Sequence, residues 1–131
     1  MKVSDYFNVV SRFLIVYLFI WAGIGKIEGY QATADYMSSM HVNPALLPLV
    51  ILLELGGGIA VVFGFLTRFT AISMAIFSIV AAVIFHIDFS NDMQKLMFIK
   101  DVSIAGGLLL LASHGSGKIS IDYLIKKKLA K

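Results

Sequence analysis

The sequence contains no cysteine and few charged residues. Without cysteine the chain has no disulfide framework, no thiolate metal ligand and no thiol nucleophile of its own. Charged residues make up 15% of its 131 residues and hydrophobic ones 59%, well above the roughly 45–50% apolar share of soluble domains. So little polar surface does not suit a soluble domain, and we expect an integral membrane protein.

The basic residues give a formal net charge of +3. They lie mainly at the two ends of the chain and in one short loop, not along an amphipathic face with interleaved aromatic side chains. A nucleic-acid-binding protein needs such a basic face. We therefore expect no nucleic-acid partner.

Four apolar blocks predict an all-α, polytopic membrane protein with a bundle of four transmembrane helices in one domain, residues 1–131. The expected spans are approximately residues 10–28, 45–66, 69–87 and 96–113. The first span extends past two cations that can reach the interface, Arg12 and Lys26. The fourth block is long enough to span the membrane only if Lys100 and Asp101 lie within the first turns of its helix. No small-x-small cleavage site follows the first block, so we interpret it as retained.

The distribution of lysine and arginine predicts the orientation. Cytoplasmic loops of membrane proteins carry an excess of these residues. Eight of the eleven lie on one side if both termini are cytoplasmic: Lys2, Arg12, Arg68, Lys118, Lys126, Lys127, Lys128 and Lys131. We therefore expect a multi-pass protein of a bacterial or archaeal cytoplasmic membrane, with both termini cytoplasmic and residues 28–43 and 88–95 facing outward.

Small residues repeat along two of the spans and predict close helix contacts. Such stripes let backbones approach where lipid supplies no hydrophobic drive for association. The second span carries Gly56, Ala60 and Gly64. The third span carries Ala71, Ala75, Ser78 and Ala82.

Glu54 is the only charged residue between residues 43 and 67. A charge near the centre of a membrane costs about 2.5–3.5 kcal/mol on insertion scales, and such residues usually face the bundle interior or a cavity. Lys26, His86, Lys100 and Asp101 are expected in the same half of the bundle. These five residues are our candidates for ligand binding or proton handling, and a purely structural ion network is the alternative.

Other polar residues carry less specific predictions. Arg12 and Arg68 are expected to be topology anchors that contact lipid headgroups. His86 and Asp88 are two close metal ligands without a third at helical spacing, so we predict no metal site. The sequence shows no haem or flavin motif either.

Several short motifs together resemble the DoxX family of small four-helix membrane proteins. They are AGIGK (22–26), LELGGG (53–58), GFLTR (64–68) and KDVSIAGGLLLLA (100–112), with Arg12 before them and His86 between the last two. The order and spacing of these polar landmarks carry the resemblance.

The resemblance implies a membrane subunit or accessory of a quinone- or thiol-linked oxidoreductase system. In that hypothesis a small amphipathic molecule such as a quinone binds between the helices, His86 bonds a carbonyl oxygen, and Glu54 or Asp101 relays a proton. Electrons would come from a redox partner protein, so the chain would be a non-autonomous subunit. Membrane lipids and a second copy of the chain, as a homodimer, are the other partners considered. The alternative is a non-catalytic lipid or solute carrier, or a membrane scaffold.

Overall fold

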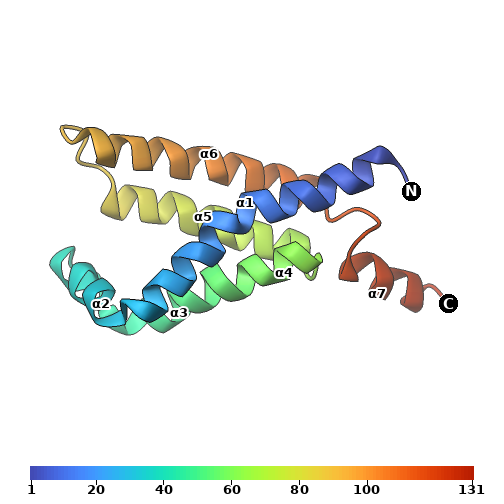
Figure 1. The fold of residues 1–131 in the computed structure, drawn as a ribbon, viewed down its shortest axis with the longest axis horizontal. Helices are drawn as coiled ribbons and strands as arrows, with labels where there is room; N and C mark the ends of the chain where they lie inside the picture. The colour runs from blue at the N-terminus through green and yellow to red at the C-terminus, as the bar shows by residue number, and fades with distance from the viewer.

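The computed structural model describes residues 1–131 and contains helices and no strands (Figure 1). Its four long helical segments are α1 (Val3–Glu28), a composite segment (Pro44–Phe63), α5 (Thr67–Phe85) and α6 (Asp92–His114). Each is long and apolar enough to cross a membrane. The predicted all-α class with four membrane-spanning helices is confirmed.

The helix bounds differ from the predicted spans by three residues or more at three ends. Helix α1 begins at Val3 instead of residue 10. Helix α6 begins at Asp92 instead of residue 96, because the Asn91 side chain accepts hydrogen bonds from two backbone amides of its first turn. The second span ends at Phe63, since Gly64 has a left-handed conformation with φ of 70° that stops a helix.

The second span is built from four pieces with different helical geometry. A 3₁₀ turn, η1 (Pro44–Leu46), leads into α3 (Leu47–Ile51), which is followed by a π-helical turn, η2 (Leu52–Gly56), and α4 (Gly57–Phe63). A π turn closes its hydrogen bonds over five residues instead of four, and such turns are frequent at functional sites. Residues before and after η2 therefore do not share one regular helical wheel.

The bundle consists of two helix pairs. Helix α1 packs along η2 and α4, and α5 packs along α6. The predicted small-residue face of α5 is confirmed, because Ala71, Ala75, Ser78 and Ala82 are all buried. Large side chains from the other elements fill the space beside it, among them Val16 of α1, Val61 of α4 and Leu108 of α6.

The contact between α1 and the second span does not use Gly56, the first residue of the predicted stripe, although Gly64, the last, lies against Arg12 of α1. Gly56 is exposed, and a Cβ there would touch only Leu52 of its own helix. Gly58 is buried instead, and its Cβ would lie 2.7 Å from Ile20 Cγ1 of α1. The prediction was wrong at Gly56 because it assumed a regular wheel through the π turn.

Both chain termini lie at the same end of the bundle, which we call the terminal end (Figure 1). The opposite end, called the loop end, carries helix α2 (Tyr30–Ser39) and the connection between α5 and α6. The sequence predicts that residues 28–43 form an outward-facing loop. The structure makes most of this stretch a helix, with Ala34 and Met37 buried against Leu47 of α3.

A short C-terminal helix, α7 (Ile121–Leu129), lies outside the bundle at the terminal end (Figure 1). Asp122 joins it to the turn between α4 and α5. Its Oδ1 accepts a hydrogen bond from Leu66 N at 2.7 Å, and its Oδ2 accepts one from Thr67 N at 2.8 Å. Asp122 therefore caps the N-terminus of α5 from a distant part of the sequence.

Candidate functional site

Lys26 and Glu54 form a two-pronged ion pair at the loop end. Lys26 Nζ lies 3.1 Å from Glu54 Oε1 and 2.9 Å from Glu54 Oε2. Lys26 is in the last turn of α1, and Glu54 is at the middle of the π turn. Glu54 is only 5% exposed, so its carboxylate has a fixed partner in a buried position. The expectation that Glu54 faces the interior is confirmed.

His86, at the end of α5, stands between two residues of α6. Its Nδ1 lies 2.7 Å from Gln94 Oε1, and its Nε2 lies 3.8 Å from Asp101 Oδ2. An amide oxygen only accepts, so this geometry places the proton of the neutral imidazole on Nδ1 and a lone pair on Nε2. The distance to Asp101 is too long for a direct hydrogen bond.

Lys100 is the last of the five candidate residues and lies next to Asp101 on α6. Its Nζ lies 4.0 Å from Asp101 Oδ1, and 39% of its side chain is exposed, more than for the other four candidates. Asp101 thus stands between a lysine and a histidine. Two lysines and two acids balance in charge, and His86 adds a proton-accepting group.

All five predicted residues line one cavity of about 660 Å³. The wall has 24 residues, 17 of them hydrophobic, contributed by every long segment and by α2. A volume of this size lies within the ~300–1,000 Å³ range of small-molecule sites, which are mostly apolar with a few polar groups. The cavity can therefore hold an elongated molecule with an apolar body and one polar head.

Helix α2 forms the wall of this cavity at the loop end. Thr33, Tyr36 and Met37 of α2 line it. The ring of Tyr36 stacks on Phe85 with centroids 5.5 Å apart, which links α2 to the end of α5 next to His86. The sequence did not predict that α2 lines a cavity, because residues 28–43 contain no long apolar segment.

Gln94 was also missed. It lies in the first turn of α6, and a polar residue there is common at any helix start, so the sequence carried no signal for its contact with His86. No group of three His, Asp or Glu side chains in the structure is placed to hold a metal ion.

Arg12 and Arg68 lie at the terminal end, away from the cavity. Arg12 is 1% exposed, and its guanidinium donates to the carbonyl oxygens of Val61, Val62 and Ile119. Arg68 donates to the carbonyls of residues 112–114 at the end of α6. Each arginine therefore donates to backbone carbonyls at a helix C-terminus. Their predicted contact with lipid headgroups stays a prediction.

The fold and site define a class: a polytopic α-helical membrane protein with a mostly apolar cavity between its helices that is also lined by ionisable side chains. The sequence profile of the DoxX family matches residues 7–87. This chain belongs to the DoxX family. The match ends near His86, so Lys100 and Asp101 lie beyond it.

Two relatives from Escherichia coli K12 extend the comparison over most of the chain. The inner membrane protein YqjF is 51% identical over 127 residues, 97% of this chain and 98% of the relative. The inner membrane protein YphA is 36% identical over 121 residues, 87% of this chain and 86% of the relative. A Haemophilus influenzae protein is 31% identical over 129 residues, 91% of this chain and 83% of its own length. No solved structure matches at a significant level.

Proposed function

We propose that this protein binds a small amphipathic molecule of the quinone class between its helices and serves as a membrane subunit or accessory of an oxidoreductase system. One observation carries the proposal: five ionisable residues from three spans and η2 line a single, mostly apolar cavity. The isoprenoid or alkyl chain of the ligand would occupy the apolar length. Its oxygenated head would lie against His86 and Asp101.

The His86–Asp101 arrangement suits a head group that exchanges a proton. A neutral His86 with its proton on Nδ1 has a free lone pair on Nε2, which accepts from a hydroxyl. A protonated His86 would donate to a carbonyl and be stabilised by Asp101, 3.8 Å away. Electrons would pass to or from a partner redox protein, since the sequence has no cysteine and no haem or flavin motif.

Glu54 has a different role in this proposal. Its two oxygens are both bonded to Lys26, so it holds the end of α1 against η2 and keeps the cavity wall in place. Proton exchange is assigned to His86 and Asp101, and Glu54 is a positioning residue.

We also propose that the protein lies in the bacterial inner membrane with both termini in the cytoplasm. The similarity to YqjF and YphA, both named as inner membrane proteins, supports the location. The excess of lysine and arginine at the terminal end supports the orientation.

Ligand-induced stabilisation tests the proposed function. The full chain in mild detergent is unfolded by heat with decylubiquinone, and with decyl alcohol as an apolar control. A ligand at 100 times its dissociation constant stabilises the folded state by about 2.7 kcal/mol. We expect stabilisation of the wild type and of His41→Ala, an exposed histidine outside the cavity, but not of His86→Ala. Equal responses of the two variants would overturn the assignment of His86.

The second candidate is a non-catalytic lipid or solute carrier. The closed Lys26–Glu54 pair favours it, because a carboxylate held by two hydrogen bonds to lysine stabilises a fold without moving protons. No stabilisation by decylubiquinone, together with lipid retained in the cavity next to His86, would support the carrier.

A further inference from the structure

His86 and Asp101 present two hydrogen-bond acceptors to the cavity of about 660 Å³, which we call the larger cavity. His86 Nε2 lies 3.8 Å from Asp101 Oδ2, too far for a direct hydrogen bond between them. Only 16% of the His86 side chain and 17% of the Asp101 side chain are exposed. A buried acceptor costs free energy unless it is hydrogen-bonded. The pair therefore favours an occupant that brings a donor to this part of the wall.

Gln94 makes His86 an acceptor on the side that faces Asp101. Its Oε1 lies 2.7 Å from His86 Nδ1. Because an amide oxygen only accepts, Nδ1 carries the proton of the neutral ring and Nε2 keeps its lone pair. Gln94 is not among the residues that line the larger cavity. It therefore acts on an occupant only through His86, and it is a positioning residue.

The two lysines of the larger cavity do not supply the missing donor. Lys100 Nζ lies 4.0 Å from Asp101 Oδ1, which is beyond hydrogen-bond length. Lys26 donates to both oxygens of Glu54 instead. Neither cation is therefore hydrogen-bonded to Asp101, and its carboxylate is available to an occupant.

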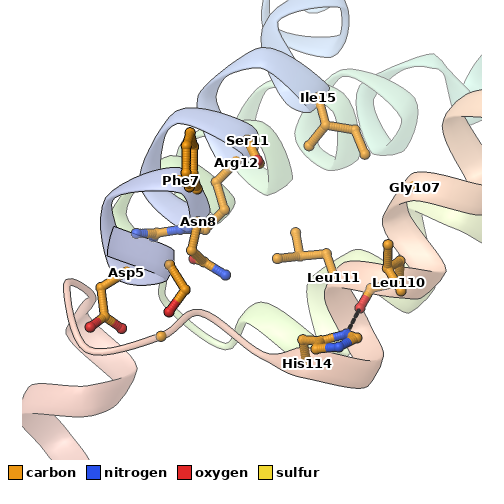
Figure 2. A pocket seen from close by; sticks show the side chains of 12 residues that line it. Asp5, Phe7, Asn8, Ser11, Arg12, Ile15, Gly107, Leu110, Leu111 and His114 are labelled. Carbon is orange, nitrogen blue, oxygen red and sulfur yellow. Dashed lines mark hydrogen bonds between the residues drawn. The ribbon is translucent and has the colours of Figure 1, made fainter. Parts of the chain in front are cut away.

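His114 shows the same ring geometry without a second acceptor. It lies at the end of α6 and lines a smaller cavity, of about 390 Å³, at the terminal end (Figure 2). Its Nδ1 lies 3.1 Å from Leu110 O, which also only accepts. His114 is exposed and forms no ion pair, so solvent reaches the free side of its ring. Of these two histidines, only His86 combines a fixed tautomer with a carboxylate across from it.

We propose that the larger cavity prefers an occupant whose polar head is a hydroxyl donor, such as a phenol or the hydroquinone form of a quinone. The hydroxyl lies between His86 Nε2 and Asp101 Oδ2, and the two acceptors share its hydrogen in a three-centre bond. A carbonyl or ether oxygen in the same place has no hydrogen to donate and faces two lone pairs. This inference rests on the proposed function, because it specifies which form of the ligand the same site prefers.

Two ligands that differ only at the hydroxyl test the preference. In para-decylphenol the oxygen carries a hydrogen, and in para-decylanisole it carries a methyl group. The full chain in mild detergent is titrated with each ligand, and the rise in unfolding temperature gives the dissociation constant. Because a hydrogen bond to a charged group is strong, we expect the wild type to bind the phenol about tenfold more tightly.

Two glutamine variants separate the role of Gln94 from a general effect of the substitution. We expect Gln94→Leu to lose most of the preference, because the proton is then free to move to Nε2 and the ring no longer accepts there. Gln31→Leu changes an exposed glutamine of α2 that does not line the larger cavity, and it should keep the preference. The detergent affects all variants alike, so the comparison between them isolates the site.

NMR of isotope-labelled histidine nitrogens reads the ring tautomer, which a merely structural glutamine would not change. We expect the proton of His86 on Nδ1 in the wild type and in Gln94→Glu, whose carboxylate also accepts. In Gln94→Leu we expect it on Nε2. His114, whose partner is the Leu110 carbonyl, should give the same signals in all three proteins.

The outcomes distinguish this inference from the proposed function. Equal or weaker binding of the phenol by the wild type would overturn the preference, even if decylubiquinone stabilises the protein. A proton on His86 Nε2 in the wild type would overturn the role of Gln94. A tenfold preference in a protein that does not respond to decylubiquinone would refute the quinone function and support the donor preference. Binding of neither ligand would refute both.

Discussion

Lys26 Nζ lies within hydrogen-bonding distance of both Glu54 oxygens, at 3.1 and 2.9 Å, and this pair joins the end of α1 to the π turn of the second span. The carboxylate is buried and the lysine is partly exposed. The pair thus offsets the free-energy cost of placing an acid in an otherwise uncharged apolar segment. It also fixes one wall of the larger cavity.

Removal of the acid alone should destabilise the fold. Glu54→Leu leaves Lys26 without its partner, and breaking a buried pair from one side costs about 3–5 kcal/mol. We expect a loss near the lower limit, because Lys26 is 26% exposed on its side chain. The double variant Lys26→Met with Glu54→Leu should recover most of it. Thermal unfolding in detergent measures the cycle, and purely additive losses would contradict the pair.

Two glycines of the second span should respond differently to a methyl group. A Cβ on Gly58 would lie 2.7 Å from Ile20 Cγ1, so Gly58→Ala should separate α1 from α4 and cost about 1–3 kcal/mol. Gly56→Ala meets only its own helix and should be neutral or slightly stabilising, since alanine favours helix. The unfolding temperatures of the two variants measure this difference. Equal decreases in unfolding temperature would mean that Gly56 is also a contact between the helices.

The absence of native cysteine makes the orientation directly measurable. Ser90→Cys at the loop end and Ala130→Cys at the terminal end each introduce one exposed thiol. In intact cells with the outer membrane permeabilised, a membrane-impermeant maleimide should label Ser90→Cys only. Both thiols should react after lysis. Labelling of Ala130→Cys in intact cells would reverse the proposed orientation.

The Asp122 cap predicts a pH dependence at the terminal end. Burial raises the pKa of Asp122, but hydrogen bonds from the backbone amides of Thr67 and Leu66 and from the Ser116 hydroxyl outweigh burial and hold the pKa below its usual value of 3.8. Because the folded pKa lies below the unfolded one, the carboxylate stabilises the fold above about pH 4, and this contribution disappears as pH falls through the folded pKa.

Hydrogen exchange of the Leu66 and Thr67 amides measures this effect. We expect their protection to decrease below about pH 4 in the wild type. Asp122→Asn should show weaker protection at neutral pH and a flatter dependence on pH. Ser120→Ala, which removes a neighbouring cap on α7, serves as the control and should keep the pH dependence. A wild type without pH dependence would contradict the role of Asp122.

Composition and block length were enough to predict four membrane-spanning helices, because a bilayer imposes one length and one polarity on every span. The same constraint made the ionisable residues conspicuous, and the structure brings all five candidates to one cavity. Gly56 was misplaced for a physical reason: a π turn leaves no mark in hydrophobic periodicity, yet it changes which residues face α1.

Other features could not be predicted because they depend on contacts between distant segments. Gln94 meets His86 only after α5 and α6 have paired, and Asp122 reaches Thr67 from 55 positions away. An arginine near the end of an apolar segment is typical of an interfacial anchor. The hydrogen bonds from buried Arg12 to α4 carbonyls instead follow from how α1 crosses that helix. Residue type indicated that these positions matter, and only the fold defines their partners.

The π turn also separates the second span into two parts that can vary independently. Deleting one residue from Leu52–Gly56 would convert the turn into regular α-helix and rotate everything before it by about 100° relative to α4. Leu46, Leu49 and Val50 would swing away from the larger cavity, while the Gly58–Ile20 contact would stay where it is. A single-residue change in length here would therefore reshape the larger cavity without dismantling the helix bundle that surrounds it.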